Sequence, residues 1–236
     1  MKPFYSLLSG MVVIAISSGL TAQSTSSSSS SSKTRKHARG ASDGIDTGSI
    51  ANGVYRNKSL GFTCKIPDGW VLRTEELNAV DEDGAAQAQQ DQPQTAQKNA
   101  EEKQSARVLL AAFSRPPEAR AEDVNASILI AVEDPATYPG LKDAAQYLEL
   151  VEEVAKKQGF ESTEEPYEFR IGAKTLPRED FEKNVGTRVM RQATLVTLER
   201  GYAISFNLIG GTEDERDQLV AGLEFQEPSR ASVPTK

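Results

Sequence analysis

The chain contains very few of the side chains on which most enzymes depend: one histidine, one cysteine and one tryptophan among 236 residues. A zinc site built from nitrogen and sulfur ligands cannot be assembled from so few. A serine or cysteine hydrolase with a histidine base is nearly excluded as well, because His37 lies in a polar, basic segment. The P-loop, dinucleotide-binding and G-x-S-x-G patterns are also missing. We therefore expect no catalytic residues, no metal and no cofactor.

Long apolar runs are equally scarce. Leu7–Leu20 is the one extended apolar segment, and its 14 residues follow a positive charge at Lys2. As a helix it would span about 21 Å, which is less than the roughly 30 Å of a bilayer core. This pattern predicts a secretion signal cleaved after Ala22, with an uncleaved membrane anchor as the alternative. We expect an exported bacterial protein, periplasmic or extracellular, that is not an integral membrane protein after cleavage.

Basic residues are in the minority, and their distribution is uneven. Residues 52–228 contain 20 Lys and Arg against 32 Asp and Glu, a net charge of −12. An acidic body argues against nucleic-acid binding, which relies on clustered Lys and Arg. The segment KTRKHAR (33–39) carries four positive charges. It could adhere to an anionic lipid or polysaccharide, or it could serve only as a solubilising run.

The composition divides the chain into segments. After the signal (1–22), a serine-rich and basic linker is expected over 23–51, since its polar residues cannot form a core. A single domain follows over 52–228, and a polar tail over 229–236. Within the domain, residues 81–104 are rich in Gln and Ala and lack large apolar side chains. We expect them to form an inserted surface loop.

Hydrophobic periodicity predicts the main elements of the domain. Residues 62–66 alternate between apolar and polar and are followed by a PDG turn, which indicates a half-buried strand. The runs 107–114 and 126–133 are almost continuously apolar and suit strands covered on both faces. From Leu141 to Ala155 the apolar residues recur with the spacing of an amphipathic helix, and Gly159 suits its C-terminal cap.

The remaining elements are a hairpin and a final helix. Residues 195–198 and 202–208 flank Gly201, which can take the positive φ of a tight turn. Thr212 and Glu215 have the spacing of a capping box for a helix that follows them. Residues 160–174 are expected to be one extended segment or an irregular pair, with TLPRED (175–180) leaving the sheet. The order of elements predicts an α+β fold, an antiparallel sheet with helices packed on it.

The stretch VYRNKSLGFTCKIPDGW resembles the start of PsbP-like domains. The matching positions are Tyr55, Asn57, Leu60, Gly61, Phe62, Pro67, Gly69 and Trp70. A late hairpin, an acid-capped helix and a closing phenylalanine fit the same order. The resemblance implies an α/β/α sandwich, and a family in which accessory, binding and chaperone-like roles predominate. It supplies no shared catalytic residues.

Few individual residues remain as functional candidates. Cys64 lies between Phe62 and Ile66 on the apolar face of its strand, so we expect a buried, inert thiol, with a reactive or intermolecularly paired thiol as the alternative. Trp70 and Tyr55 are the candidate partner-binding residues, although a tryptophan after a PDG turn at the start of a strand is more often packed in the core. Asp81–Gly84 resembles part of a calcium loop but lacks its spacing.

Two hypotheses about function result. The first is an exported, non-catalytic domain that binds a protein or envelope component in an accessory or chaperone-like role. The alternative is a carboxylate-dependent hydrolase acting on a glycan or envelope polymer, which requires two facing acids in a cleft, one of them with a raised pKa. The sequence leaves the oligomeric state and the identity of the partner open.

Overall fold

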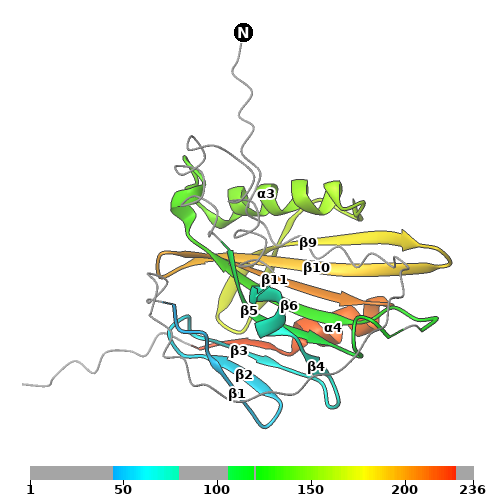
Figure 1. The fold of residues 1–236 in the computed structure, drawn as a ribbon. Helices are drawn as coiled ribbons and strands as arrows, with labels where there is room; N and C mark the ends of the chain where they lie inside the picture. The colour runs from blue at the N-terminus through cyan, green and yellow to red at the C-terminus, as the bar shows by residue number, and fades with distance from the viewer. Residues whose placement is uncertain (1–44, 80–105, 120, 227–236) are drawn as a thin grey trace, which may run out of the picture.

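The computed structural model describes residues 45–79, 106–119 and 121–226, which form two antiparallel sheets and a few helices (Figure 1). The smaller sheet has the order β1-β2-β3-β12, and the larger has the order β4-β5-β6-β11-β10-β9-β7, with β8 also paired to β9. The strands are β1 (Ser49–Ala51), β2 (Val54–Asn57), β3 (Phe62–Lys65), β4 (Val71–Leu72), β5 (Ala106–Phe113), β6 (Ser127–Glu133), β7 (Glu161–Ser162), β8 (Tyr167–Ile171), β9 (Lys174–Val185), β10 (Arg188–Glu199), β11 (Tyr202–Gly210) and β12 (Leu223–Phe225). The helices are η3 (Pro135–Thr137), α3 (Ala144–Lys157), α4 (Glu213–Ala221) and a helical segment over 74–79. The predicted α+β class is confirmed.

The large sheet is the middle layer of the fold, because successive side chains of its strands point to opposite faces. On one face, Val196 and Ala203 pack beneath Tyr147, Leu148 and Val151 of α3. On the other face, Leu195 and Phe206 join the main core, to which β3, α4 and β12 also contribute. Figure 1 shows α3 on one side of the sheet, with α4 and the small sheet on the other. The second sheet is a layer that the sequence did not predict.

Helix α3 forms where the periodicity predicted it. The side chain of Asp143 accepts a hydrogen bond from the backbone N–H of Gln146 at 2.9 Å, which caps the N-terminus. Lys156 and Lys157 occupy the last turn, where positive charge is favourable. Gly159 follows with a φ of +85°, as its predicted capping role requires. Leu141 packs beside the helix but precedes its first turn.

Two-residue turns join β10 to β11 and β8 to β9. Between β10 and β11, Arg200 (φ +51°) and Gly201 (φ +85°) both take left-handed conformations, as a two-residue type I′ turn demands. Between β8 and β9, Gly172 has a φ of +60° at the first turn position. Only glycine adopts that conformation without strain, and the turn fixes the register of β8 against β9.

The structure corrects two predictions. Residues 175–180 do not leave the sheet: they form the first half of β9, and Arg178 and Asp180 are buried there because they neutralise each other. The ordered fold also begins before residue 52. Asp46 accepts hydrogen bonds from Gly48 and Ser59, and β1 already pairs with β2. The signal, most of the linker, the insert over 81–104 and the tail lie outside the described residues.

Candidate partner-binding site

The structure places the two residues predicted to bind a partner beside the main core. Tyr55 is 1% exposed, and its hydroxyl donates to the carbonyl of Thr47 at 2.9 Å. Burial raises the pKa of Tyr55 to about 12. Trp70 is half-buried and packs against the same core after the turn at Pro67–Gly69. Tyr55 is thus part of the packing, and partner binding at either residue stays a prediction.

The thiol of Cys64 has the environment that the strand pattern predicted. Cys64 is fully buried in β3, where it pairs with Tyr55 of β2 and with Leu223 of β12. Burial raises its pKa to about 12, so the thiolate is scarcely populated near neutral pH. The interpretation of Cys64 as a core residue is confirmed.

A surface hollow of about 440 Å³ lies between β8, α4 and β12, and we call it the β8–α4 hollow. Its apolar lining comes from Phe169 and Ile171 of β8, Val220 of α4 and Leu223 of β12. Its polar lining comes from Arg170, Arg178 and Asp217. A concave site with an apolar surface and a few placed polar groups is typical of binding sites.

Beneath this hollow, Arg178 is held by two carboxylates and two aromatic rings. Its Nε and Nη2 donate to Asp180 at 2.8 Å each, and Nη2 also donates to Asp217 at 2.9 Å. Its guanidinium carbon lies 4.6 Å from the ring centre of Phe169 and 5.7 Å from that of Tyr167. Only 4% of the Arg178 side chain is exposed. The aromatic and charged contacts together fix the orientation of this guanidinium.

A second arginine, Arg216 of α4, completes the charge network. Its Nη1 lies 3.4 Å from Asp180, and its Nε donates to Asp217 at 3.0 Å. Partial burial alone would raise the pKa of Asp217, but the hydrogen bonds from Arg216 and Arg178 hold it below its ordinary value. Two arginines and two aspartates therefore balance one another, and the half-exposed Asp217 carboxylate remains at the edge of the hollow.

Strand β8 borders the hollow with an unpaired outer edge. It pairs with β9 from Tyr167↔Arg178 to Ile171↔Lys174. In a hairpin with a two-residue turn the flanking residues form a hydrogen-bonded pair, and such pairs then alternate along the ladder. Glu168 therefore lies opposite Pro177, which has no N–H, and the backbone groups of Glu168 and Arg170 point away from β9. Among the described residues, no other strand pairs with this edge.

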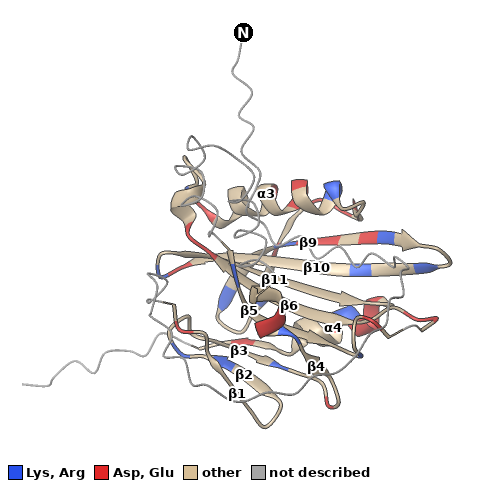
Figure 2. Cartoon of the chain, in the orientation of Figure 1, with Lys and Arg blue, Asp and Glu red and all other residues tan. Residues whose placement is uncertain are grey.

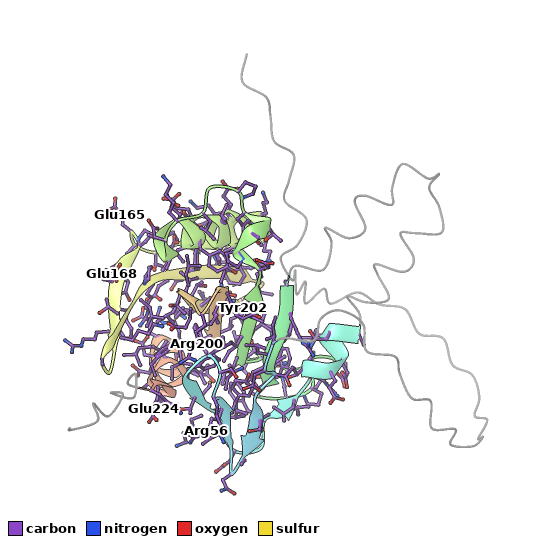
Figure 3. The ribbon with its side chains drawn as sticks, turned by 90° about the vertical axis from the view of Figure 1, so that its left-hand side faces the viewer. Arg56, Glu165, Glu168, Arg200, Tyr202 and Glu224 are labelled. Atoms are coloured by element: carbon purple, nitrogen blue, oxygen red, sulfur yellow. The ribbon has the colours of Figure 1, made fainter. Side chains whose placement is uncertain are left out.

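Four exposed side chains on and near β8 are acidic. Glu161, Glu164, Glu165 and Glu168 are all exposed. Figure 3 shows Glu165 and Glu168 on the outer side of the molecule, with Glu224 on the same side below them. Elsewhere Figure 2 shows acidic and basic residues interspersed over α3, β9 and α4. Charge along an edge strand discourages indiscriminate pairing with other chains.

Among the residues that the structure describes, the arrangement of acids gives the hydrolase hypothesis no support. Burial raises the pKa of two carboxyls, Glu133 and Glu179, but both lie on the face covered by α3, and neither lines the β8–α4 hollow or the second hollow described below. A second hollow of about 510 Å³ is bordered by five acids, with Asp180 among them engaged by two arginines; the others are Glu161, Glu164, Glu182 and Glu213. Within the described residues, no group of three or more His, Cys, Asp and Glu could hold a metal ion.

Sequence reasoning missed the residues of the β8–α4 hollow. The alternation of Tyr167, Phe169 and Ile171 was a usable signal for β8, since all three lie on one face of a strand. Arg178 and Asp180 also share one face of β9. Because charged residues are rarely buried, two of them on one face of a strand are a weak signal for a buried pair.

Comparisons with known proteins find similar structures but no match to a protein family or a curated protein. Cyanobacterial PsbP from Synechocystis sp. PCC 6803 is 17% identical, with 75% of this chain and 98% of that chain covered and a TM-score of 0.41. LpqN, involved in cell envelope biogenesis of Mycobacterium tuberculosis, is 14% identical, with 70% of this chain and 83% of that chain covered and a TM-score of 0.37.

A Pseudomonas aeruginosa protein of unknown function is 17% identical, with 50% of this chain and 80% of that chain covered and a TM-score of 0.32. A PsbP structure is thus among the similar ones, as the sequence resemblance predicted. Because all three TM-scores are below 0.5, no functional argument rests on these likenesses. Within the described ranges, no helix is long and apolar enough to span a membrane.

Proposed function

We propose that the chain is an exported, non-catalytic domain that binds an extended segment of a partner protein at the β8–α4 hollow. The observation that carries the proposal is the position of an apolar hollow directly beside the unpaired edge of β8. An extended peptide can add to such an edge through its main chain, while its alternate side chains enter the neighbouring pocket. The predicted secretion signal and the shortage of catalytic side chains support an accessory role outside the cytoplasm.

The geometry of β8 specifies how a segment would bind. The added strand would pair with the outward N–H and C=O groups of Glu168 and Arg170. Its residues opposite Phe169 and Ile171 would then turn their side chains toward the hollow, because paired residues lie on the same face of a sheet. Those side chains would then pack against Val220 and Leu223 in the lining of the hollow.

A proline at residue 170 tests this binding mode. Arg170→Pro removes an N–H that points away from β9, so the β8–β9 ladder keeps its hydrogen bonds. Arg170→Ala removes the same side chain but retains the N–H, and serves as the matched control. We expect chemical cross-linking in the native envelope to join the wild type and Arg170→Ala to one dominant protein, and Arg170→Pro to lose it. Equal capture by both variants would overturn the proposal, as would the lack of any captured protein.

A further inference from the structure

Arg178 makes fewer hydrogen bonds than its guanidinium allows. Nε and Nη2 bind Asp180 and Asp217, whereas Nη1 makes no hydrogen bond to a described residue. The side chain is 96% buried, since 4% is exposed, and it lines the β8–α4 hollow. An arginine fixed by two carboxylates and two rings presents its remaining N–H donors in a set direction, and planar anions such as carboxylates fit such donors.

We propose that the segment bound in the β8–α4 hollow carries a carboxylate side chain that accepts a hydrogen bond from Nη1 of Arg178. This inference rests on the proposed function and names the chemistry of its partner. Beside the charged groups of Arg170, Arg178 and Asp217, the hollow has an apolar lining of Phe169, Ile171, Val220 and Leu223. The fitting segment is therefore extended, with an acidic side chain and an apolar side chain on the same face, two residues apart.

The charges around Arg178 predict that removal of one acid, Asp217, strengthens the binding of an acidic segment. Asp217 is half exposed, lines the hollow and carries a negative charge close to the Arg178 guanidinium. It therefore repels an incoming carboxylate while holding Arg178 in place. Replacing it with asparagine keeps an acceptor oxygen for Arg178 and removes the repulsion. Asp217→Asn should consequently bind an acidic segment more tightly, a gain that a purely structural role for Asp217 would not produce.

The test uses two pools of blocked hexapeptides in which threonine alternates with random Val, Leu, Ile or Phe. One apolar position is glutamate in the first pool and glutamine in the second. Binding to the full chain is followed by fluorescence anisotropy, and the amide NMR signals of Glu168 and Arg170 report the place of binding. We expect the glutamate pool to bind at least fivefold more tightly, and Asp217→Asn to widen that ratio severalfold.

Glu224→Gln is the matched control for Asp217→Asn. Glu224 is exposed on the neighbouring strand β12 and does not line the hollow (Figure 3), so the same loss of charge there should leave the ratio unchanged. Equal binding of both pools at β8 would overturn the carboxylate inference and leave the proposed function intact. Failure of both pools to shift the β8 amides would overturn both. Displacement of the glutamate pool by laurate would assign the site to a lipid carboxylate and overturn the peptide inference.

Discussion

Arg178 and Asp180 lie two residues apart on β9 and form a two-point ion pair, in which each side chain is only 4% exposed. Taking both charges out of water is costly, and their close contact offsets that cost only while both are present. The pair sits directly beneath the β8–α4 hollow, because Arg178 is one of the residues that line it. The stability of this part of the fold and the proposed binding site therefore depend on the same contact.

Removing one member of the pair should be strongly destabilising. Asp180→Ala leaves Arg178 with one carboxylate partner in a buried position, and we expect a loss of about 3–5 kcal/mol in the free energy of unfolding. Urea denaturation followed by circular dichroism measures this loss. Asp217→Ala is the control, because its carboxylate is 53% exposed and water can replace it. Similar losses for the two variants would show that the buried carboxylate of Asp180 contributes no more to the free energy of unfolding than the exposed carboxylate of Asp217.

The aromatic core between the two sheets should also be sensitive to truncation. Phe62 is fully buried, and its ring lies edge-on to that of Phe206 with 5.1 Å between the ring centres. Phe62→Ala should lower the free energy of unfolding by about 3–5 kcal/mol, since it leaves a large cavity between the layers. Phe225→Ala, at a partly buried position of the same cluster, should cost clearly less. Thermal denaturation of both variants checks the order, and a reversed order would refute it.

The buried thiol predicts a simple chemical result. With its pKa raised to about 12 by burial, Cys64 should not react with a disulfide reagent at pH 8 in the folded protein. One equivalent should react promptly once the chain is unfolded in guanidinium chloride. The measurement is thiol titration with and without denaturant. Rapid reaction in native buffer would contradict the interpretation of Cys64 as a buried core residue and would favour the alternative of a reactive thiol.

The stability of the fold should depend on pH through Glu179. This carboxyl is fully buried. Burial, with a further contribution from Glu152, raises its pKa above the ordinary 4.5. The unfolded chain therefore loses this proton first, so the contribution of Glu179 to stability is greatest below about pH 4.5 and is lost as the pH rises.

Glu179→Gln should remove that part of the pH dependence and stabilise the protein at pH 7, because a neutral amide carries no cost of ionisation. One pKa unit of difference corresponds to about 1.4 kcal/mol. Melting temperatures between pH 4 and 8 test the effect, with Glu149→Gln at an exposed position of α3 as the control. Parallel curves for the wild type and Glu179→Gln would show that Glu179 does not titrate as described.

The elements with a clear hydrophobic period were predicted from the sequence. The strand at Phe62, the helix α3 and the hairpin around Gly201 all appear where the pattern indicated. The cap at Thr212 also forms, with its hydroxyl accepting from the N–H of Glu215 at 3.1 Å. The carboxylate of Glu215, however, accepts from the N–H of Gly211 rather than that of Thr212, so the reciprocal half of the capping box is displaced by one residue.

The site was harder to predict, because it depends on contacts between distant elements. Arg178 is buried only because Asp180 on its own strand and Asp217 on α4, 39 residues away, accept its hydrogen bonds. Local hydropathy assigns such a residue to the surface. A proline is normally unfavourable inside a strand, yet Pro177 lies opposite Glu168, where the ladder of an edge hairpin needs no N–H from it. Ion pairing thus accounts for the burial of Arg178, and strand pairing accounts for the place of Pro177.

The central claim, that a partner protein binds at the β8–α4 hollow, is tested most directly by site-specific photo-cross-linking in the native envelope. A photoreactive side chain at Ala221, which is exposed and lines the hollow, is compared with one at Arg56, which is exposed on β2 of the small sheet (Figure 3). The account predicts one dominant protein adduct from Ala221 that the glutamate peptide pool suppresses, and no such adduct from Arg56. Capture that is equal at the two positions, or unaffected by the peptides, would contradict it.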